Sequence, residues 1–308
     1  MRITACMLLA IFVAFMCCSE KSNPVDTGAD FIRVSAAEMV ARNGAHPDWS
    51  PDQGCIAYSF FMGSGTNIFT ISCVDSVIRQ ITNEETYNNH PFWSPDGNQI
   101  GFSSDRGGNQ RYNIFAADIQ SGEITRLTPD SIGVQSGDWS SDGESVVFDG
   151  TSRSLNHAAI SIKKLTTNVL ISLHPDLDYA GWPKFSPVDD RIVFEALANN
   201  SVDYNIWTII SDGTGLKQIT TTGGEYPCWS PDGLWIAYSN KLEGNYDLFM
   251  IKSDGSGSPV QVTNTQSANE VRASWAPGGD AIAYDTMMGT DTVDPQNAGV
   301  YVLTIEFL

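Results

Sequence analysis

The chain is poor in positive charge. Its 308 residues include 17 lysines and arginines against 36 aspartates and glutamates, which gives a formal net charge of -19 at pH 7. The acidic residues are spread through turns and loops and do not form a tail. A negative field of this kind repels phosphate backbones and anionic lipids, so the composition argues against nucleic acid and membrane surfaces as binding partners.

Long apolar segments are also scarce. The run from Ile3 to Phe15 follows Arg2 and is too short to span a bilayer, which is typical of an export signal. Because this run ends at Cys17 and Cys18 before a polar stretch, it resembles a bacterial lipoprotein signal, and we expect Cys18 to carry the lipid. We therefore expect a signal at residues 1–17, a flexible tether at 18–30 and a folded domain at 31–308. The alternative is an ordinary cleaved signal that leaves a soluble exported protein.

Helical periodicity is absent, and a repeat with strand periodicity takes its place. Six aromatic anchor residues recur at spacings of 44, 46, 46, 44 and 46 residues. The anchors are Trp49, Trp93, Trp139, Phe185, Trp229 and Trp275. This period is typical of a four-stranded propeller blade, whereas helical solenoids of similar period show apolar residues every three or four positions.

The register inside each repeat is also fixed. Seven residues after each anchor stands an aliphatic residue, and two positions further stands an aromatic one. The pairs are Ile56 and Tyr58, Ile100 and Phe102, Val146 and Phe148, Ile192 and Phe194, Ile236 and Tyr238, and Ile282 and Tyr284. The residue between them is always small, apolar or both, so we expect a strand buried on two faces where blades stack. A turn written Ser-Pro-Asp-Gly, complete at Ser94–Gly97 and Ser230–Gly233, joins each anchor to this strand.

Only five of the six repeats contain a recognisable fourth strand. Ile32 to Ser35 precedes the first repeat and shows the same alternation as those fourth strands. We therefore predict an all-β fold, a six-bladed β-propeller with four-stranded antiparallel blades, in which the N-terminal strand closes the last blade.

The repeat motif of anchor, Ser-Pro-Asp-Gly, aliphatic, apolar and aromatic residues resembles the repeats of the TolB family from about Phe31 to the C-terminus. The resemblance implies an exported periplasmic module that binds a lipoprotein partner over the propeller mouth. Full-length TolB proteins also carry an N-terminal α/β domain, for which we expect no room before the first strand. Similar repeats occur in the propellers of prolyl oligopeptidases, but this chain has no Gly-x-Ser-x-Gly elbow, which argues against peptidase activity.

The variable loops are expected to carry the binding site, and they belong to one face of the ring. These loops join second to third strands and fourth strands to the next blade. The candidate residues on this loop-rich face are Asp105, Arg106, Arg111, Tyr112, Tyr204, Glu225, Tyr226, Lys241 and Tyr246. The alternative for the segment from Ser104 to Asn109 is a hydrogen-bonded loop without a partner.

The four histidines fall in segments assigned to the same face: His46, His90, His157 and His174. Imidazoles that converge near the channel could bind a transition metal, with Asp48 or Glu225 as a further ligand. The chain resembles a related propeller family, the oligogalacturonate lyases, in which a histidine-based metal site supports cleavage of sugar chains. However, His46 and His90 both stand three residues before an anchor, so the repeat alone explains their placement.

The cysteines of the predicted domain are few and odd in number, which leaves at least one unpaired. Cys55 opens the second strand of the first repeat and Cys73 ends the third, so a cross-strand disulfide is one interpretation and two buried thiols the other. Cys228 adjoins Trp229 and is expected to pack in the core.

These patterns contain no complete catalytic constellation. We therefore predict a non-catalytic, cofactor-free binding or scaffolding module of the cell envelope that engages a protein or glycan partner on the loop-rich face. A metal-dependent polysaccharide lyase or hydrolase at the channel mouth is the alternative. We expect the protein in the periplasm or on the outer membrane, attached to lipid only through its N-terminus.

Overall fold

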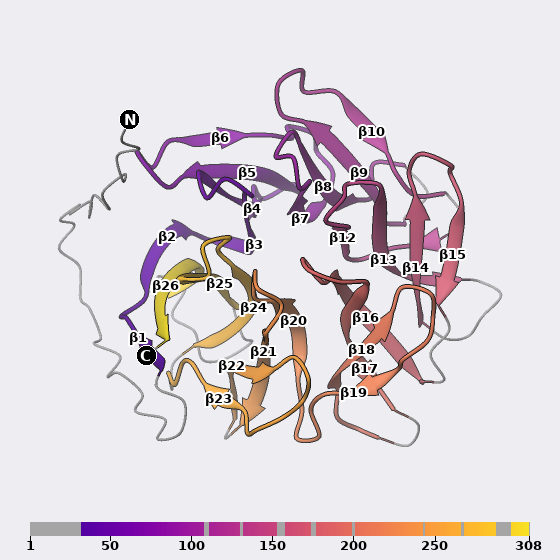
Figure 1. Cartoon of the computed structure of the whole chain (residues 1–308). Helices are drawn as coiled ribbons and strands as arrows, with labels where there is room; N and C mark the ends of the chain where they lie inside the picture. The colour runs from indigo at the N-terminus through magenta and orange to yellow at the C-terminus, as the bar shows by residue number, and fades with distance from the viewer. Residues whose placement is uncertain are drawn as a thin grey trace, which may run out of the picture.

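The computed structural model describes residues 32–107, 111–129, 132–152, 158–173, 177–198, 201–242, 244–265, 268–287 and 297–307. These residues form 26 strands. Six antiparallel sheets stand around a central axis as the blades of a propeller (Figure 1). Among the described residues, none belongs to a helix long and apolar enough to cross a membrane.

Within blades one to five, strand order from the axis to the rim follows the chain. Blade one consists of β3 (Gly44–Trp49), β4 (Cys55–Phe61), β5 (Thr66–Ser72) and β6 (Ile78–Gln80). Blade two consists of β7 (Asn88–Trp93), β8 (Gln99–Ser104), β9 (Asn113–Asp118) and β10 (Ile124–Arg126). In blade three the inner strand is split into β11 (Ile132–Gly133) and β12 (Gly137–Trp139), followed by β13 (Ser145–Ser152), β14 (Ala158–Lys164) and β15 (Leu170–Leu173). Blade four consists of β16 (Tyr179–Phe185), β17 (Arg191–Leu197), β18 (Asn205–Ile210) and β19 (Lys217–Gln218). Blade five consists of β20 (Glu225–Trp229), β21 (Trp235–Leu242), β22 (Asn245–Lys252) and β23 (Val260–Gln261).

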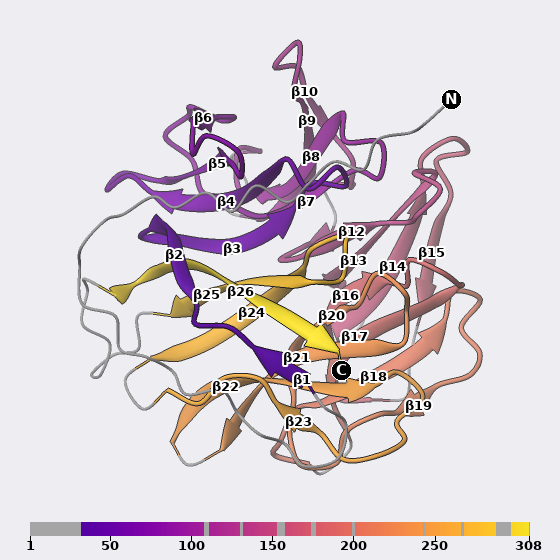
Figure 2. The ribbon, with the colours of Figure 1, turned by 60° about the vertical axis from the view of Figure 1, so that its left-hand side comes forward.

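Blade six is made from both ends of the described chain. Its inner strands are β24 (Asn269–Trp275), β25 (Ala281–Met287) and β26 (Gly299–Phe307). Two N-terminal strands, β1 (Ile32–Val34) and β2 (Glu38–Arg42), pair with successive halves of β26. Ile32 lies opposite Phe307, and Met39 lies opposite Tyr301. Figure 2 shows these indigo strands beside the yellow C-terminal strand. The predicted closure by the N-terminal strand is confirmed, and it extends beyond Ser35 to a second strand.

The Ser-Pro-Asp-Gly turn explains how each anchor passes into the second strand. In blade two the Ser94 hydroxyl donates to Asp96 at 2.7 Å and accepts the backbone N–H of Gln99 at 2.9 Å. Gly97 takes a φ of +70°, where a side chain would strain the backbone. Blade five repeats the contact between Ser230 and Asp232 at 2.6 Å.

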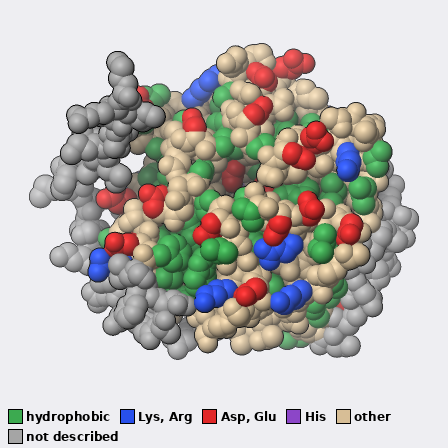
Figure 3. Space-filling model, viewed as in Figure 1, with side chains coloured by type: hydrophobic (Ala, Val, Ile, Leu, Met, Phe, Trp, Pro, Cys, Tyr) green, Lys and Arg blue, Asp and Glu red, His purple; other side chains and the backbone are tan. Residues whose placement is uncertain are grey.

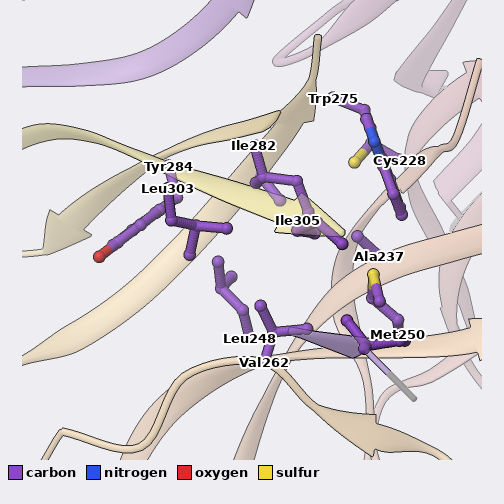
Figure 4. Packing of buried hydrophobic residues seen from close by; sticks show 12 residues of the cluster. Cys228, Ala237, Leu248, Met250, Val262, Trp275, Ile282, Tyr284, Leu303 and Ile305 are labelled. Carbon is purple, nitrogen blue, oxygen red and sulfur yellow. The ribbon is translucent and has the colours of Figure 1, made fainter. Parts of the chain in front are cut away.

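The core lies between blades, because each sheet buries both faces against its neighbours. Figure 4 shows the packing between blades five and six, where apolar side chains of the two sheets meet. Blade five contributes Cys228, Ala237, Leu248, Met250 and Val262, and blade six contributes Trp275, Ile282, Tyr284, Leu303 and Ile305. Each second strand is thus buried on two sides, as its residue pattern predicts.

Candidate functional site

Five of the six inner strands are interrupted at the same position by a β-bulge. The residue three before the anchor has a positive φ in each of them, between 53° and 55° across the five blades. These residues are His46, His90, Trp182, Tyr226 and Arg272, and we call them the bulge ring. Their side chains line a central channel together with Ser136, which occupies the equivalent place in blade three. Positive φ costs a bulky residue on the order of 1–3 kcal/mol, so the surrounding structure must hold each bulge in place.

The side chains of the bulge ring contact one another around the channel. The His46 and His90 rings lie 4.0 Å apart at an interplanar angle of 75°. Trp182 meets His90 on one side and Tyr226 on the other, both at 4.8 Å and almost perpendicular. The Arg272 guanidinium completes the set, since it lies 5.6 Å from the Tyr226 ring and contacts His46 Nε2.

Buried polar side chains on second strands brace the bulges of neighbouring blades. Asp285 of blade six accepts the backbone N–H of His46 at 3.1 Å, and Glu195 of blade four accepts that of Tyr226 at 2.9 Å. Asp285 is only 1% exposed and also pairs with Arg272 at 2.9 Å. These bracing residues stand ten positions after an anchor and were missed by our sequence analysis. Recurrent polar residues within a buried strand were the signal that could have revealed them.

Glu195 makes the bracing testable by pH. Burial raises the pKa of its carboxyl from 4.5 to about 8, so the folded protein holds a proton that the unfolded chain releases. The resulting stabilisation is complete below pH 4.5 and is lost as the pH rises through about 8. The free energy of unfolding of the wild type should fall between about pH 6 and pH 9. We expect Glu195→Gln to reduce this fall by up to about 2 kcal/mol, measured by urea unfolding. Glu123→Gln, on an exposed turn, should leave the wild-type pH profile unchanged; an unchanged profile for Glu195→Gln would contradict the assignment.

A second ring lies one residue before each anchor and carries opposite charges. It consists of Asp48, Phe92, Asp138, Lys184, Cys228 and Ser274, and we call it the lower ring. Asp48 and Asp138 accept the backbone N–H groups of the next blades' residues Trp93 and Phe185 at 2.8 and 2.9 Å. Lys184 pairs with Asp138 at 3.3 Å. The bonds from these carboxylates join adjacent blades around the axis.

Burial alters the titration of the lower ring. It raises the pKa of Asp48 to about 6, although Lys184 opposes the shift. Burial alone would lower the pKa of Lys184, but Asp138 and Asp48 outweigh it and the net shift is upward. Burial also raises the pKa of the Cys228 thiol to about 12, so this cysteine remains protonated at neutral pH. A reactive thiolate in the channel is therefore not supported.

Except for Phe92, the residues of the two rings line a cavity of about 320 Å³ to which all six blades contribute. The face seen in Figure 3 carries interspersed acidic and basic side chains, and its hydrophobic side chains form several separate patches. The predicted pair His46 and His90 is brought together here, whereas His157 and His174 lie outside the described residues. Among the residues that are described, no group of three or more His, Cys, Asp or Glu is arranged to hold a metal ion.

Five of the nine residues predicted for the loop-rich face gather on blades four and five. The Tyr246 hydroxyl donates to Glu225 at 2.7 Å, and the Lys241 ammonium lies 5.8 Å from the Tyr246 ring. Tyr204 packs edge-on against Tyr179 at 5.3 Å. We call Tyr179, Tyr204, Glu225, Lys241 and Tyr246 the tyrosine patch. Tyr226, the fifth predicted residue, follows Glu225 in the chain and belongs to the bulge ring, where it contacts Trp182.

The other four predicted residues lie on blade two, where Arg106 has an internal role. Its guanidinium pairs with Glu84 at 2.7 Å and stands about equally far from the Phe102 and Phe115 rings, at 5.0 and 5.1 Å. Its side chain is only 14% exposed, so it braces the loop. Asp105 accepts the Tyr87 backbone N–H at 2.9 Å. Neighbouring Arg111 and Tyr112 begin the next described segment and are half-buried.

The predicted cysteine pair is not directly opposed in the hairpin of β4 and β5. Cys55 and Cys73 are free thiols in the structure, and Cys55 lies opposite Ser72 in the hairpin, one residue from Cys73. A disulfide between them therefore stays a prediction, and the register does not favour it. Cys228 is buried between blades five and six, where core packing was expected. Cys18, with the expected signal and tether, lies outside the described residues.

Six four-stranded blades around a channel lined by side chains define the chain as a six-bladed β-propeller. The profile of the family described as "TolB beta propeller domain" matches residues 25–178, half of the chain. The chain therefore belongs to the TolB beta propeller domain family. The expected resemblance is confirmed.

Individual relatives agree with this assignment. The Tol-Pal system protein TolB of Francisella tularensis subsp. tularensis is 25% identical over 219 residues, which cover 68% of this chain and 49% of that protein. The chain thus spans about half the length of the curated relatives it matches. The crystal structure of TolB from Acinetobacter baumannii superimposes with a TM-score of 0.64 and 18% identity, over 85% of this chain and 63% of that one.

The same fold occurs in an enzyme. An oligogalacturonate lyase in complex with manganese superimposes with a TM-score of 0.61 and 17% identity, over 91% of this chain and 80% of that one. At this identity the likeness establishes the fold and leaves the chemistry of this chain open.

Proposed function

We propose that the chain is a non-catalytic binding module of the cell envelope, exported to the periplasm, whose loop-rich face engages another envelope protein through the tyrosine patch. The observation that carries the proposal is a pair of contacts on adjacent blades, Tyr179 against Tyr204 and Tyr246 to Glu225. Tyrosine supplies a large contact area at low entropic cost and is enriched in the energetic centres of protein interfaces.

Charge indicates what the partner presents. Glu225 lies in the tyrosine patch, and the exposed Asp178 and Asp203 belong to the same blade as Tyr179 and Tyr204. The whole chain carries a net charge of -19. A partner surface with lysine and arginine next to apolar side chains complements this composition, and association should weaken as salt increases.

Crosslinking in the native envelope tests the proposal. We expect Tyr204→Ser combined with Tyr246→Ser to reduce partner capture at least about tenfold, since two central interface side chains are removed. Tyr87→Ser is the matched control, because Tyr87 is an exposed tyrosine in the loop between blades one and two. Capture lost with the control but kept with the double variant would refute the patch. A glycan partner would instead show itself as capture that survives protease treatment of the bound fraction.

The alternative is a metal-dependent polysaccharide lyase or hydrolase. The contact between the His46 and His90 rings supports it. Burial lowers the pKa of His90 to about 3 and that of His46 well below its ordinary value, so both imidazoles are neutral and able to coordinate. However, the Arg272 guanidinium contacts His46 Nε2, and a cation at that nitrogen opposes a metal ion. Stoichiometric zinc or manganese in the purified protein, lost in His46→Ala and His90→Ala, would favour this alternative.

A further inference from the structure

The side chains of the bulge ring are larger than the fold requires. A bulge repeated in five blades belongs to the propeller architecture, so its positive φ alone marks no site. Glycine and asparagine adopt positive φ at the lowest cost, and this chain uses asparagine elsewhere, at Asn43 and Asn168. None of the five bulge positions holds either residue type. Imidazole, indole, phenol and guanidinium groups are instead held in the channel at an energetic cost, which is typical of functional sites.

Four of these side chains carry hydrogen-bonding atoms without a partner among the described residues, and those of His46 (Nδ1) and Arg272 (Nε) are fully buried. The Tyr226 and Trp182 side chains line the cavity, and among the described residues these two bond to carboxylates only through their backbone N–H groups, to Glu195 and Asp149. Because the Tyr226 hydroxyl and the Trp182 indole N–H face the cavity, both donors are available to a bound molecule.

Both cationic side chains of the channel are paired within the protein. Arg272 pairs with Asp285 at 2.9 Å, and Lys184 pairs with Asp138 at 3.3 Å. Asp48 accepts hydrogen bonds from the Trp93 backbone and the Ser274 hydroxyl. A charged ligand of either sign would therefore meet a like charge and gain little from a counter-charge that is already engaged.

We infer that the channel is a second binding site, independent of the partner surface, which takes one or two units of an uncharged sugar beside Trp182 and Tyr226. The indole and phenol faces contact the apolar C–H surface of the sugar ring, and their unused donors bind its oxygens. The cavity of about 320 Å³ is at the small end of ligand pockets, which suits a mono- or disaccharide and excludes a folded protein segment.

Isothermal titration of the whole chain with cellobiose and with maltose tests the inference. We expect saturable millimolar or tighter binding of at least one of them, and at least about tenfold weaker binding to Tyr226→Phe and to Trp182→Phe. Both variants keep an aromatic ring, and Tyr226→Phe removes a hydroxyl without a protein partner, so its thermal midpoint should match the wild type. Digalacturonate and glucosamine, probes with negative and positive charge, should bind more weakly than the neutral sugars.

Three results would overturn the inference. They are the absence of saturable binding for both neutral disaccharides, binding that survives in both variants, and tighter binding of a charged probe than of either neutral one. Tyr246→Ser, outside the channel, should leave sugar binding intact while it weakens partner capture. Failure of the partner surface and failure of the channel site are thus distinguishable.

Discussion

Removal of residues 32–42 should abolish cooperative folding of the propeller. These residues form β1 and β2, which pair with β26 along both halves of its length. Without them β26 becomes an open sheet edge, and the buried Ile32 and Ala41 leave the apolar clusters that they join. The expected loss exceeds about 5 kcal/mol, which is comparable to the whole stability of an ordinary domain. Urea unfolding followed by circular dichroism measures it.

Arg33→Ala provides the matched control for this deletion. Arg33 lies in β1 and pairs with Glu306 at 3.0 Å, but the two side chains are 63% and 59% exposed. An exposed ion pair contributes about 1 kcal/mol at most, so the control should keep a midpoint close to the wild type. A truncated chain with an unchanged urea midpoint would show that the ring does not depend on this closure.

Gly101→Val should destabilise blade two by about 3 kcal/mol, because a β-carbon at Gly101 would overlap the Phe92 ring. Phe92 and Gly101 lie opposite each other on β7 and β8, and both are fully buried. The equivalent pair in blade four is Lys184 and Val193, where a side chain that extends along the channel leaves room for valine. The large phenylalanine of blade two thus depends on the absent side chain of its neighbour.

A double substitution tests this dependence. Phe92→Cys with Gly101→Ala recreates the cross-strand pair that Cys228 and Ala237 form in blade five. We expect the double variant to be more stable than the sum of the two single-variant losses predicts. The favourable coupling in a double-mutant cycle should be about 1 kcal/mol or more. Additive effects in urea unfolding would contradict the packing argument.

The ring architecture was predictable because its determinants are local. Each anchor, turn and second strand lies within a short stretch, and the missing fourth strand near Ile32 followed from counting the repeats. The predicted histidine pair also came together, since His46 and His90 occupy the same place in adjacent repeats.

The contacts within the channel were not predictable from the same pattern. His46 and Arg272 are 226 residues apart and meet only because the ring closes. Arg106 was predicted to face a partner because it lies in a variable loop, but Glu84 and two phenylalanine rings bind it. Neither the repeat period nor the composition contains information about which loop side chains turn inward.

The braces of the bulge ring run from one blade to the next. Asp285, Ser59 and Glu195 each accept a hydrogen bond from the bulge residue of the following blade, and Asp48 and Asp138 accept one from the anchor of the following blade. The diameter of the opening is therefore set by bonds between blades, and it can widen only if several of them break together. We therefore expect the channel to select molecules by their width. Widening it to fit a larger molecule would break several hydrogen bonds between blades at once.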